Sequence, residues 1–174
     1  MRVNLSDSEN TRLAFSLLRI MVADETDISE IRDLELNSGP YRFTRTIPAM
    51  LNTRNERRAL SRLNEICDDY LSRYPTTLEQ DVAMLASNEL PMYSNRRNAV
   101  IQVKGEKEIL HVLKKLVQCA LRLISAESHE TVAATLGLIR RDEHTYVQQY
   151  CEILALRLWR KEFEAKKNVQ ATVD

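Results

Sequence analysis

The chain has 174 residues, which is enough for one domain with a substantial hydrophobic core. Its 25 Lys and Arg residues balance 25 Asp and Glu residues, and a formal net charge of zero argues against a dedicated nucleic-acid binder, whose affinity comes mainly from neutralising phosphates. Charged residues at 29% and hydrophobic residues at 44% are typical of a globular protein and not of a disordered one.

The chain contains few residues that break helices. Only three glycines and four prolines occur, which favours long helices over many short strands. We therefore expect an all-α fold, an orthogonal or antiparallel bundle of about six to seven helices. Cys67, Cys119 and Cys151 are odd in number and far apart, which indicates reduced, mostly buried thiols in an intracellular compartment. No signal peptide is visible, and no run approaches the roughly 18 apolar residues of a membrane span.

Two helices are expected before residue 40. The first is predicted over residues 9–22, with an apolar face formed by Leu13, Leu17, Ile20 and Met21. Asp27 and Glu30 resemble a capping pair, which predicts a short helix through Ile31 and Leu34. The turn signal NSGP at residues 37–40 then opens a loop to about residue 52, in which we expect core contacts from Tyr41, Phe43 and Ile47.

The next helix has clear signals at both ends. Residues 53–56 (TRNE) fit the capping box, in which a hydroxyl and a carboxylate satisfy reciprocal backbone donors. Its apolar face is predicted to comprise Leu60, Leu63, Cys67, Tyr70, Leu71 and Tyr74. Pro75 disfavours a helical Tyr74, so the helix is expected to end there.

A sharp corner between two helices is expected in the stretch YLSRYPTTLEQDVAML, residues 70–85. Residues 76–79 form a second capping box, in which Thr76 caps the following helix. Glu79 and Asp81 lie in the first turn of that helix, where negative charge complements the helix dipole. The buried stripe of this helix is predicted to be Leu78, Val82 and Leu85.

Three more helices are expected in the second half of the chain. A long one covers residues 94–124, and residues 125–128 form a connection. The next carries Val132, Leu136 and Ile139, and the last covers residues 142–167 with Val147, Cys151, Leu154, Leu158 and Trp159. We expect residues 1–124 to form the main helical domain and residues 125–174 to form a C-terminal helical extension.

Gly105 is unusual because it lies inside the predicted long helix. Glycine at such a position costs about 1 kcal/mol relative to alanine. Close packing against a neighbouring helix or a local kink would explain it, and a functional hinge is a further alternative.

The sequence offers no strong candidate for catalysis. His129 and Glu130 begin a zinc-binding H-E-x-x-H pattern, but Ala133 stands where the second histidine is needed. The cysteines lie on apolar faces, where thiols are usually inert. Glu79 and Asp81 are two residues apart on a helix and therefore point in different directions. We expect no catalytic, cofactor-binding or metal-binding residue in this chain.

Two groups of arginines are candidates for contact with a protein. Arg54, Arg58 and Arg62 recur every four residues, so they lie along one face of a helix, and Arg96 and Arg97 form an adjacent pair. These faces are either ordinary solvated surface or contacts for an acidic partner, because arginine is favoured in charge recognition at interfaces.

Two short motifs together resemble a known family. Residues 74–81 (YPTTLEQD) resemble a Y-x-T-T-x-E-E-D signature, and residues 105–110 (GEKEIL) resemble a G-E-K-x-I-L signature. Their order and spacing are similar to those of the Rubisco LSMT substrate-binding domain, over roughly residues 5–118. Gln80 stands where an acidic residue is usual, and Val103 where an arginine is common. The motif positions, which we expect to be architectural, are Thr76, Thr77, Glu79, Asp81, Gly105, Glu106 and Lys107.

The resemblance implies an all-helical lobe that docks a protein substrate. In that family the lobe is the C-terminal module of SET-domain protein-lysine methyltransferases, whose SET domain binds S-adenosylmethionine. The asparagine-histidine pair and the glycine-bearing cofactor loop of a SET domain are absent from this sequence. We therefore expect no activity from this chain alone, and S-adenosylmethionine only if a SET domain is supplied upstream. The chain is either the C-terminal part of a longer methyltransferase or a free-standing module.

Other functional hypotheses stay open. The chain could be a helical scaffold that assembles through its C-terminal helix, or an RNA-binding protein that uses the arginine face, although nucleic acid is disfavoured. Some members of the resembled family reside in plastids, so the expected location is the cytoplasm or a plastid, and no membrane association is expected.

Overall fold

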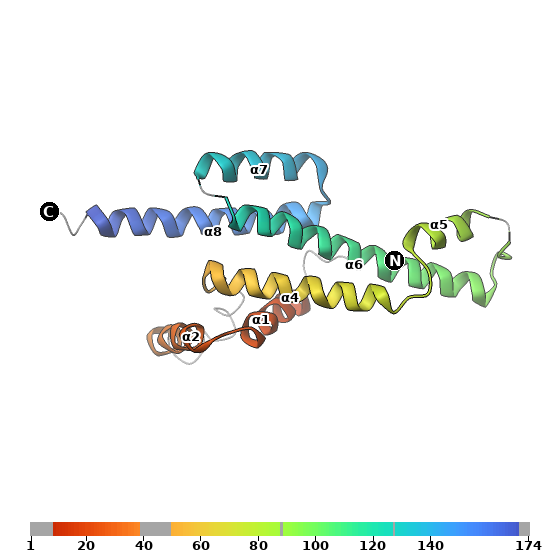
Figure 1. Cartoon of the computed structure of the whole chain (residues 1–174), viewed down its shortest axis with the longest axis horizontal. Coiled ribbons are helices and arrows are strands. Elements are labelled where there is room, and N and C mark those ends of the chain that lie inside the picture. Colours follow the sequence, from red (N-terminus) through yellow and green to blue (C-terminus); the bar gives the residue numbers. More distant parts are fainter. Residues whose placement is uncertain (1–8, 39–49, 88, 127, 171–174) are drawn as a thin grey trace.

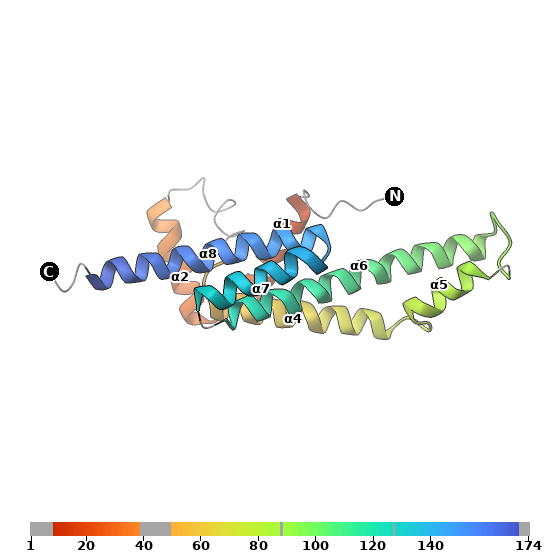
Figure 2. The ribbon, with the colours of Figure 1, turned by 90° about the horizontal axis from the view of Figure 1, so that it is seen from above.

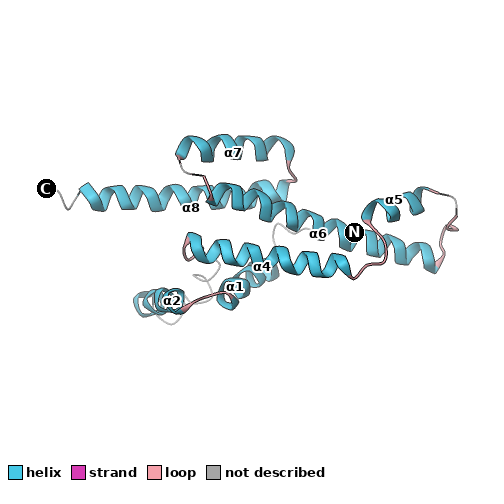
Figure 3. Ribbon diagram, in the orientation of Figure 1, coloured by secondary structure: helices cyan, strands magenta, loops and turns pink. Residues whose placement is uncertain are grey.

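The computed structural model describes residues 9–38, 50–87, 89–126 and 128–170. Within these ranges the chain forms helices and no strand, which confirms the all-α class (Figure 3). The helices are α1 (Glu9–Met21), α2 (Glu25–Ser38), α4 (Thr53–Ser72), α5 (Leu78–Ala86), α6 (Asn95–Ile124), α7 (His129–Asp142) and α8 (Thr145–Gln170). The predicted core contacts of Tyr41, Phe43 and Ile47 lie outside the described residues.

An antiparallel pair, α4 and α6, runs along the long axis of the molecule (Figures 1 and 2). The chain turns a corner after α4, and α5 packs against the N-terminal half of α6. α7 and α8 pack against the other half of α6 and against each other, while α1 crosses beneath α4. Antiparallel and crossing helices are thus combined, as expected. None of the described helices is both long and apolar enough to span a membrane.

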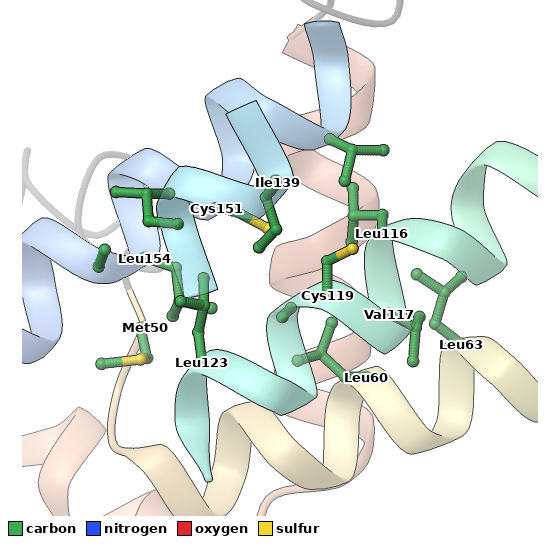
Figure 4. Packing of buried hydrophobic residues seen from close by; sticks show 14 of the residues in the cluster. Met50, Leu60, Leu63, Leu116, Val117, Cys119, Leu123, Ile139, Cys151 and Leu154 are labelled. Atoms are coloured by element: carbon green, nitrogen blue, oxygen red, sulfur yellow. The ribbon is translucent and has the colours of Figure 1, made fainter. Parts of the chain in front are cut away.

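One hydrophobic core joins helices from both halves of the chain (Figure 4). Apolar residues at helical spacing in α4, α6, α7 and α8 meet there because each helix turns one stripe inward. The fully or nearly fully buried members include Leu60, Leu63, Leu116, Val117, Leu123, Val132, Leu136, Ile139, Val147 and Leu154. Burying one such side chain contributes about 1.5–3 kcal/mol relative to exposing it. Residues after position 124 therefore share their core with the main domain.

The three cysteines are buried and unbridged, as predicted. Cys67 lies in α4, Cys119 in α6 and Cys151 in α8. Burial raises the pKa of all three thiols, and for Cys151 burial, with smaller effects from Cys119 and Glu143, raises the pKa to about 12. Such thiols stay protonated at neutral pH and act as packing groups.

The predicted apolar face of α1 is wrong for its described side chains. Leu17, Ile20 and Met21 are 51%, 43% and 69% exposed, whereas Phe15, Ser16 and Arg19 are buried. α1 is therefore rotated about its axis relative to the predicted orientation. The cause is polar, because the Arg19 guanidinium pairs with the buried carboxylate of Glu56 on α4. Phe15 adds a ring contact with Tyr150 of α8, with 5.2 Å between ring centroids.

Two helix starts differ from the predicted caps. Asn52, and not Thr53, caps α4, since its side chain accepts a hydrogen bond from the Asn55 N–H at 2.7 Å. α2 begins earlier than expected because Asp24 and Asp27 accept each other's backbone N–H groups. By contrast, Ser94 caps α6 and Ser128 caps α7, within a residue or so of the predicted starts.

Candidate functional site

The N-cap of α5, at the corner between α4 and α5, lies one residue later than predicted. The Thr77 hydroxyl accepts a hydrogen bond from the Gln80 N–H at 3.2 Å, and the Gln80 side chain accepts one from the Thr77 N–H at 2.8 Å. The assignment of Thr76 as the cap is therefore wrong. Gln80, which departs from the usual acidic residue, completes this capping box as a glutamate would.

Thr76 serves instead as a ligand for Lys107 of α6. The Lys107 Nζ donates to the Thr76 carbonyl at 2.7 Å, to the Thr76 Oγ1 at 2.8 Å and to the Asp81 Oδ2 at 2.6 Å. The Thr76 hydroxyl in turn donates to the Asp81 Oδ1 at 2.6 Å. All three ammonium hydrogens thus have an acceptor, which is what an ion pair needs when both partners are buried.

This ion pair is almost completely withdrawn from solvent, since Lys107 is 1% and Asp81 is 2% exposed. Burial by itself would raise the pKa of Asp81, but hydrogen bonds from Lys107 and Thr76 outweigh it and lower that pKa. Asp81 occupies the inward position of α5 that we predicted for Val82, which is 46% exposed. Glu79 lies exposed in the first turn of α5, as expected for a residue that complements the helix dipole.

A second contact joins the same two motifs at the surface. The Tyr74 hydroxyl donates to the Glu106 Oε2 at 2.7 Å, and the Tyr74 ring centroid lies 5.0 Å from the Lys107 Nζ. The Y-x-T-T and G-E-K motifs therefore contact each other directly and join the α4–α5 corner to α6. The carboxylates of Asp81 and Glu106 are thus bound by groups of the same chain.

Gly105 does not mark a close helix contact. A Cβ atom placed on Gly105 would have no heavy atom of the described residues within 4 Å, leaving aside the nearby backbone of its own helix. α6 continues through it from Asn95 to Ile124. The close-packing explanation is therefore wrong.

Arg54 and Arg58 face an acidic pair on the same molecule. Both guanidinium groups contact Asp24 and Asp27, with Arg54 Nη2 at 3.2 Å from each carboxylate and Arg58 Nη1 at 2.9 Å from Asp24. Burial alone would raise the pKa of Asp27, but hydrogen bonds from Asn52, Asn55, the Asp24 N–H and Arg54 hold that pKa far below its usual value. Of the three arginines predicted along this face, Arg54 and Arg58 thus have their charges compensated by carboxylates of the same chain.

The remaining arginines differ from one another. Arg62 pairs with Glu65 at 2.7 Å on the surface of α4. The Arg97 Nη1 donates to the carbonyl oxygens of Leu85 and Leu90 at 3.3 and 3.4 Å, which fixes the loop before α6. Arg96 is exposed, and its side chain forms no ion pair or hydrogen bond with the described part of the chain.

Sequence reasoning missed a cluster formed by the buried Arg19 and Glu56 with the half-buried Tyr150. Arg19 donates to both Glu56 oxygens, at 2.6 Å from Nε and 2.8 Å from Nη2, and the Tyr150 hydroxyl donates to the same carboxylate. Burial, and then the neighbouring Glu56, raise the pKa of Tyr150 well above its usual value. The only hint in the sequence was an arginine within an otherwise apolar part of α1.

Among the described residues, no three His, Cys, Asp or Glu side chains lie close enough together to hold a metal ion. The polar clusters described above instead consist of carboxylates bound by bases, amides or hydroxyl groups. One cluster joins α2 to α4, a second joins the α4–α5 corner and α5 to α6, and a third joins α1 and α4 to α8.

Comparison with protein families shows the family to which the chain belongs. Residues 1–110 match the sequence model of the Rubisco LSMT substrate-binding family. This range includes most of the helical lobe and both motifs that the Lys107–Asp81 pair connects. The chain belongs to this family. No curated protein and no solved structure gives a significant match.

Proposed function

We propose that this chain is the protein-recognition module of a SET-domain protein-lysine methyltransferase and has no catalytic activity of its own. The family match over residues 1–110 carries this proposal. It is supported by the chemistry of the motif residues, because Asp81, Glu106 and Lys107 each have partners within the chain. Lys107 and Asp81 are also 1% and 2% exposed, so a substrate has little access to them.

The described residues do not fit a methyl donor. A site for S-adenosylmethionine in a SET domain needs a glycine-bearing loop, whereas Gly105 and Gly137 both lie inside helices. S-adenosylmethionine would therefore be held by a SET domain, and this chain would contribute only contacts to the protein that is methylated.

Calorimetry and a methyl-transfer assay test the catalytic part of this proposal. The purified chain is titrated with S-adenosylmethionine and incubated with labelled cofactor and protein extracts. We expect no heat of binding and no transfer of label. Binding at micromolar concentrations, or label incorporated by the chain alone, would contradict the assignment.

Affinity capture tests the recognition part. Proteins retained by the immobilised chain are identified, examined for methyl-lysine by mass spectrometry, and then purified for titration. We expect saturable binding to at least one protein that carries methyl-lysine. If saturable binding is found only to proteins without that modification, or not at all, recognition of a methyltransferase substrate is wrong.

A second candidate function is assembly through α8, and one observation favours it. Ile153 and Leu156, three residues apart on α8, are 52% and 61% exposed. Deleting the helix is a poor test, because α8 also supplies Val147 and Cys151 to the core. The double variant Ile153→Ser, Leu156→Ser should abolish self-association while the chain stays folded, and an unchanged sedimentation profile would exclude this function.

A further inference from the structure

The loop between α5 and α6 lies at one end of the elongated molecule (Figures 1 and 2). Two large side chains there face solvent: Met92 is 72% exposed and Tyr93 is 90% exposed. The neighbouring Leu90 is buried, and Arg97 binds the carbonyl oxygens of Leu85 and Leu90. The exposed side chains are therefore presented from an anchored loop.

Tyr93 also has an unfavourable backbone conformation. Its φ angle is 66°, and no other non-glycine residue in the described part of the chain has a positive φ. It is the third residue of a turn closed by the Ser94 N–H donating to the Pro91 carbonyl at 3.2 Å. Such a position favours glycine or asparagine, because other residues pay a steric cost there. A tyrosine held in this conformation with almost no contacts in the chain suggests a contact outside it.

The charge around Tyr93 indicates what kind of partner would fit. The charged residues between positions 87 and 99 are Glu89, Arg96 and Arg97, which leaves one net positive charge. Because Arg97 is engaged with loop carbonyls, Arg96 is the exposed cation of this segment. Of the five arginines predicted to contact a partner, it alone makes no side-chain bond within the described residues.

We propose that Met92, Tyr93 and Arg96 form a docking tip that inserts into an apolar recess, rimmed by carboxylates, on a partner protein. Tyrosine and arginine are enriched among residues that dominate binding energy, and methionine adapts to irregular apolar surfaces. This deepens the proposed function, on which it rests, by naming the recognition surface and the chemistry of the substrate protein. One net positive charge is too little for nucleic acid.

Site-specific crosslinking identifies the partner. The photoreactive residue p-benzoylphenylalanine replaces Tyr93 in the full chain, and replaces Tyr70, an exposed tyrosine on α4, as the matched control. The crosslinked protein is identified in cells that express the chain, and is then purified. We expect a product from position 93 that position 70 does not give. Equal products at both positions, or none at position 93, would overturn the proposal.

Titration with the purified partner then tests the mechanism. Tyr93→Gly should weaken binding by about tenfold or more, although glycine tolerates this φ and the thermal midpoint should be unchanged or higher. Arg96→Glu should weaken binding and remove its salt dependence, whereas Arg62→Glu should not. Undiminished binding by Tyr93→Gly would overturn the docking tip. A Tyr93-dependent dimer, or a crosslink to RNA, would overturn it in favour of another occupant.

The two proposals can fail separately. If the partner depends on Tyr93 but carries no methyl-lysine, the docking tip stands and the link to a methyltransferase fails. If methyl-lysine proteins bind Tyr93→Gly and wild type equally, recognition stands and the docking tip is wrong.

Discussion

Lys107 carries a full positive charge to a position with 1% exposure, which is tolerated only because three oxygen acceptors surround it. A buried ion pair is no stronger than a good apolar contact, but removing one partner leaves the other charge without compensation. Removing either Lys107 or Asp81 should therefore be strongly destabilising, and the geometry of the α4–α5 corner depends on this pair.

Lys107→Met should lower the free energy of unfolding by about 3–5 kcal/mol, because it strands the buried Asp81 carboxylate. Urea denaturation measures the loss. Lys104→Met is the matched control, since Lys104 pairs with Glu108 on the same helix but at the surface, and should cost less than about 1 kcal/mol. Similar losses in both variants would show that the pair is not structural.

Gly105→Ala should raise the free energy of unfolding by about 1 kcal/mol, because alanine loses less backbone entropy in a helix. Apart from the nearby backbone of α6 itself, the added methyl group would meet no heavy atom of the described residues within 4 Å, and the same holds for Gly137 in α7. Gly137→Ala is thus a parallel variant with the same expected gain. A loss of stability at Gly105 alone, measured by thermal unfolding, would indicate that α6 bends there.

At the scale of elements, the start of α5 shows that neighbouring residues can compete for the N-cap position of a helix. Thr76 and Thr77 are adjacent hydroxyls, and either could cap α5 from sequence alone. Lys107, thirty-one residues away, decides the matter by engaging Thr76. A contact of such long range has no local signature.

Thr77→Ala should destabilise the protein by about 1 kcal/mol, since the Gln80 N–H loses its acceptor. Thr77→Ser keeps the hydroxyl and should restore most of this stability. The measurement is chemical denaturation of both variants. An alanine variant as stable as the wild type would show that another group caps α5.

Much of the fold was predictable because it depends on local signals. Regular apolar spacing gave the extent of α6 to within a residue and the buried face of α7. Of the face predicted for α4, Leu60, Leu63 and Cys67 are buried, whereas Tyr70 is 49% exposed, so its assignment to the core is wrong. The last helix is α8 (Thr145–Gln170) and not residues 142–167, because α7 continues to Asp142. The exposed stripe of α1 could not be foreseen, because the rotation of α1 depends on Arg19 meeting Glu56 on another helix. The two family motifs indicated the α4–α5 corner, but their direct contact through Lys107 and Asp81 required the structure.

At the scale of the whole molecule, two carboxylates make stability depend on acidity. Asp27 and Asp81 both have a pKa below that of an unfolded aspartate, so the unfolded chain binds more protons as the pH falls. Their stabilisation is fully present above about pH 5, and it is lost progressively as the pH drops from the ordinary aspartate pKa toward the lower pKa values of the folded state.

Urea denaturation between about pH 6 and pH 3 checks this dependence. The wild type should lose stability over that range, and Asp27→Asn should lose less because it has one such carboxylate fewer. Asp69→Asn, at an exposed pair with Arg73, serves as the control and should follow the wild type. A parallel curve for Asp27→Asn would contradict the role given to Asp27.

A fragment of residues 1–124 should unfold without a cooperative transition, because Val147, Cys151 and Leu154 of α8 fill the core against α4 and α6. A fragment ending at residue 160 retains these residues and should keep the transition. Circular dichroism during heating distinguishes the two. Equal cooperativity would support an independent domain ending at residue 124.

The three buried thiols can report local opening of the helical bundle. Cys67, Cys119 and Cys151 lie in three different helices, and each must reach solvent before an alkylating reagent can modify it. Mass spectrometry of partly alkylated protein would thus record, helix by helix, which part of the bundle opens first.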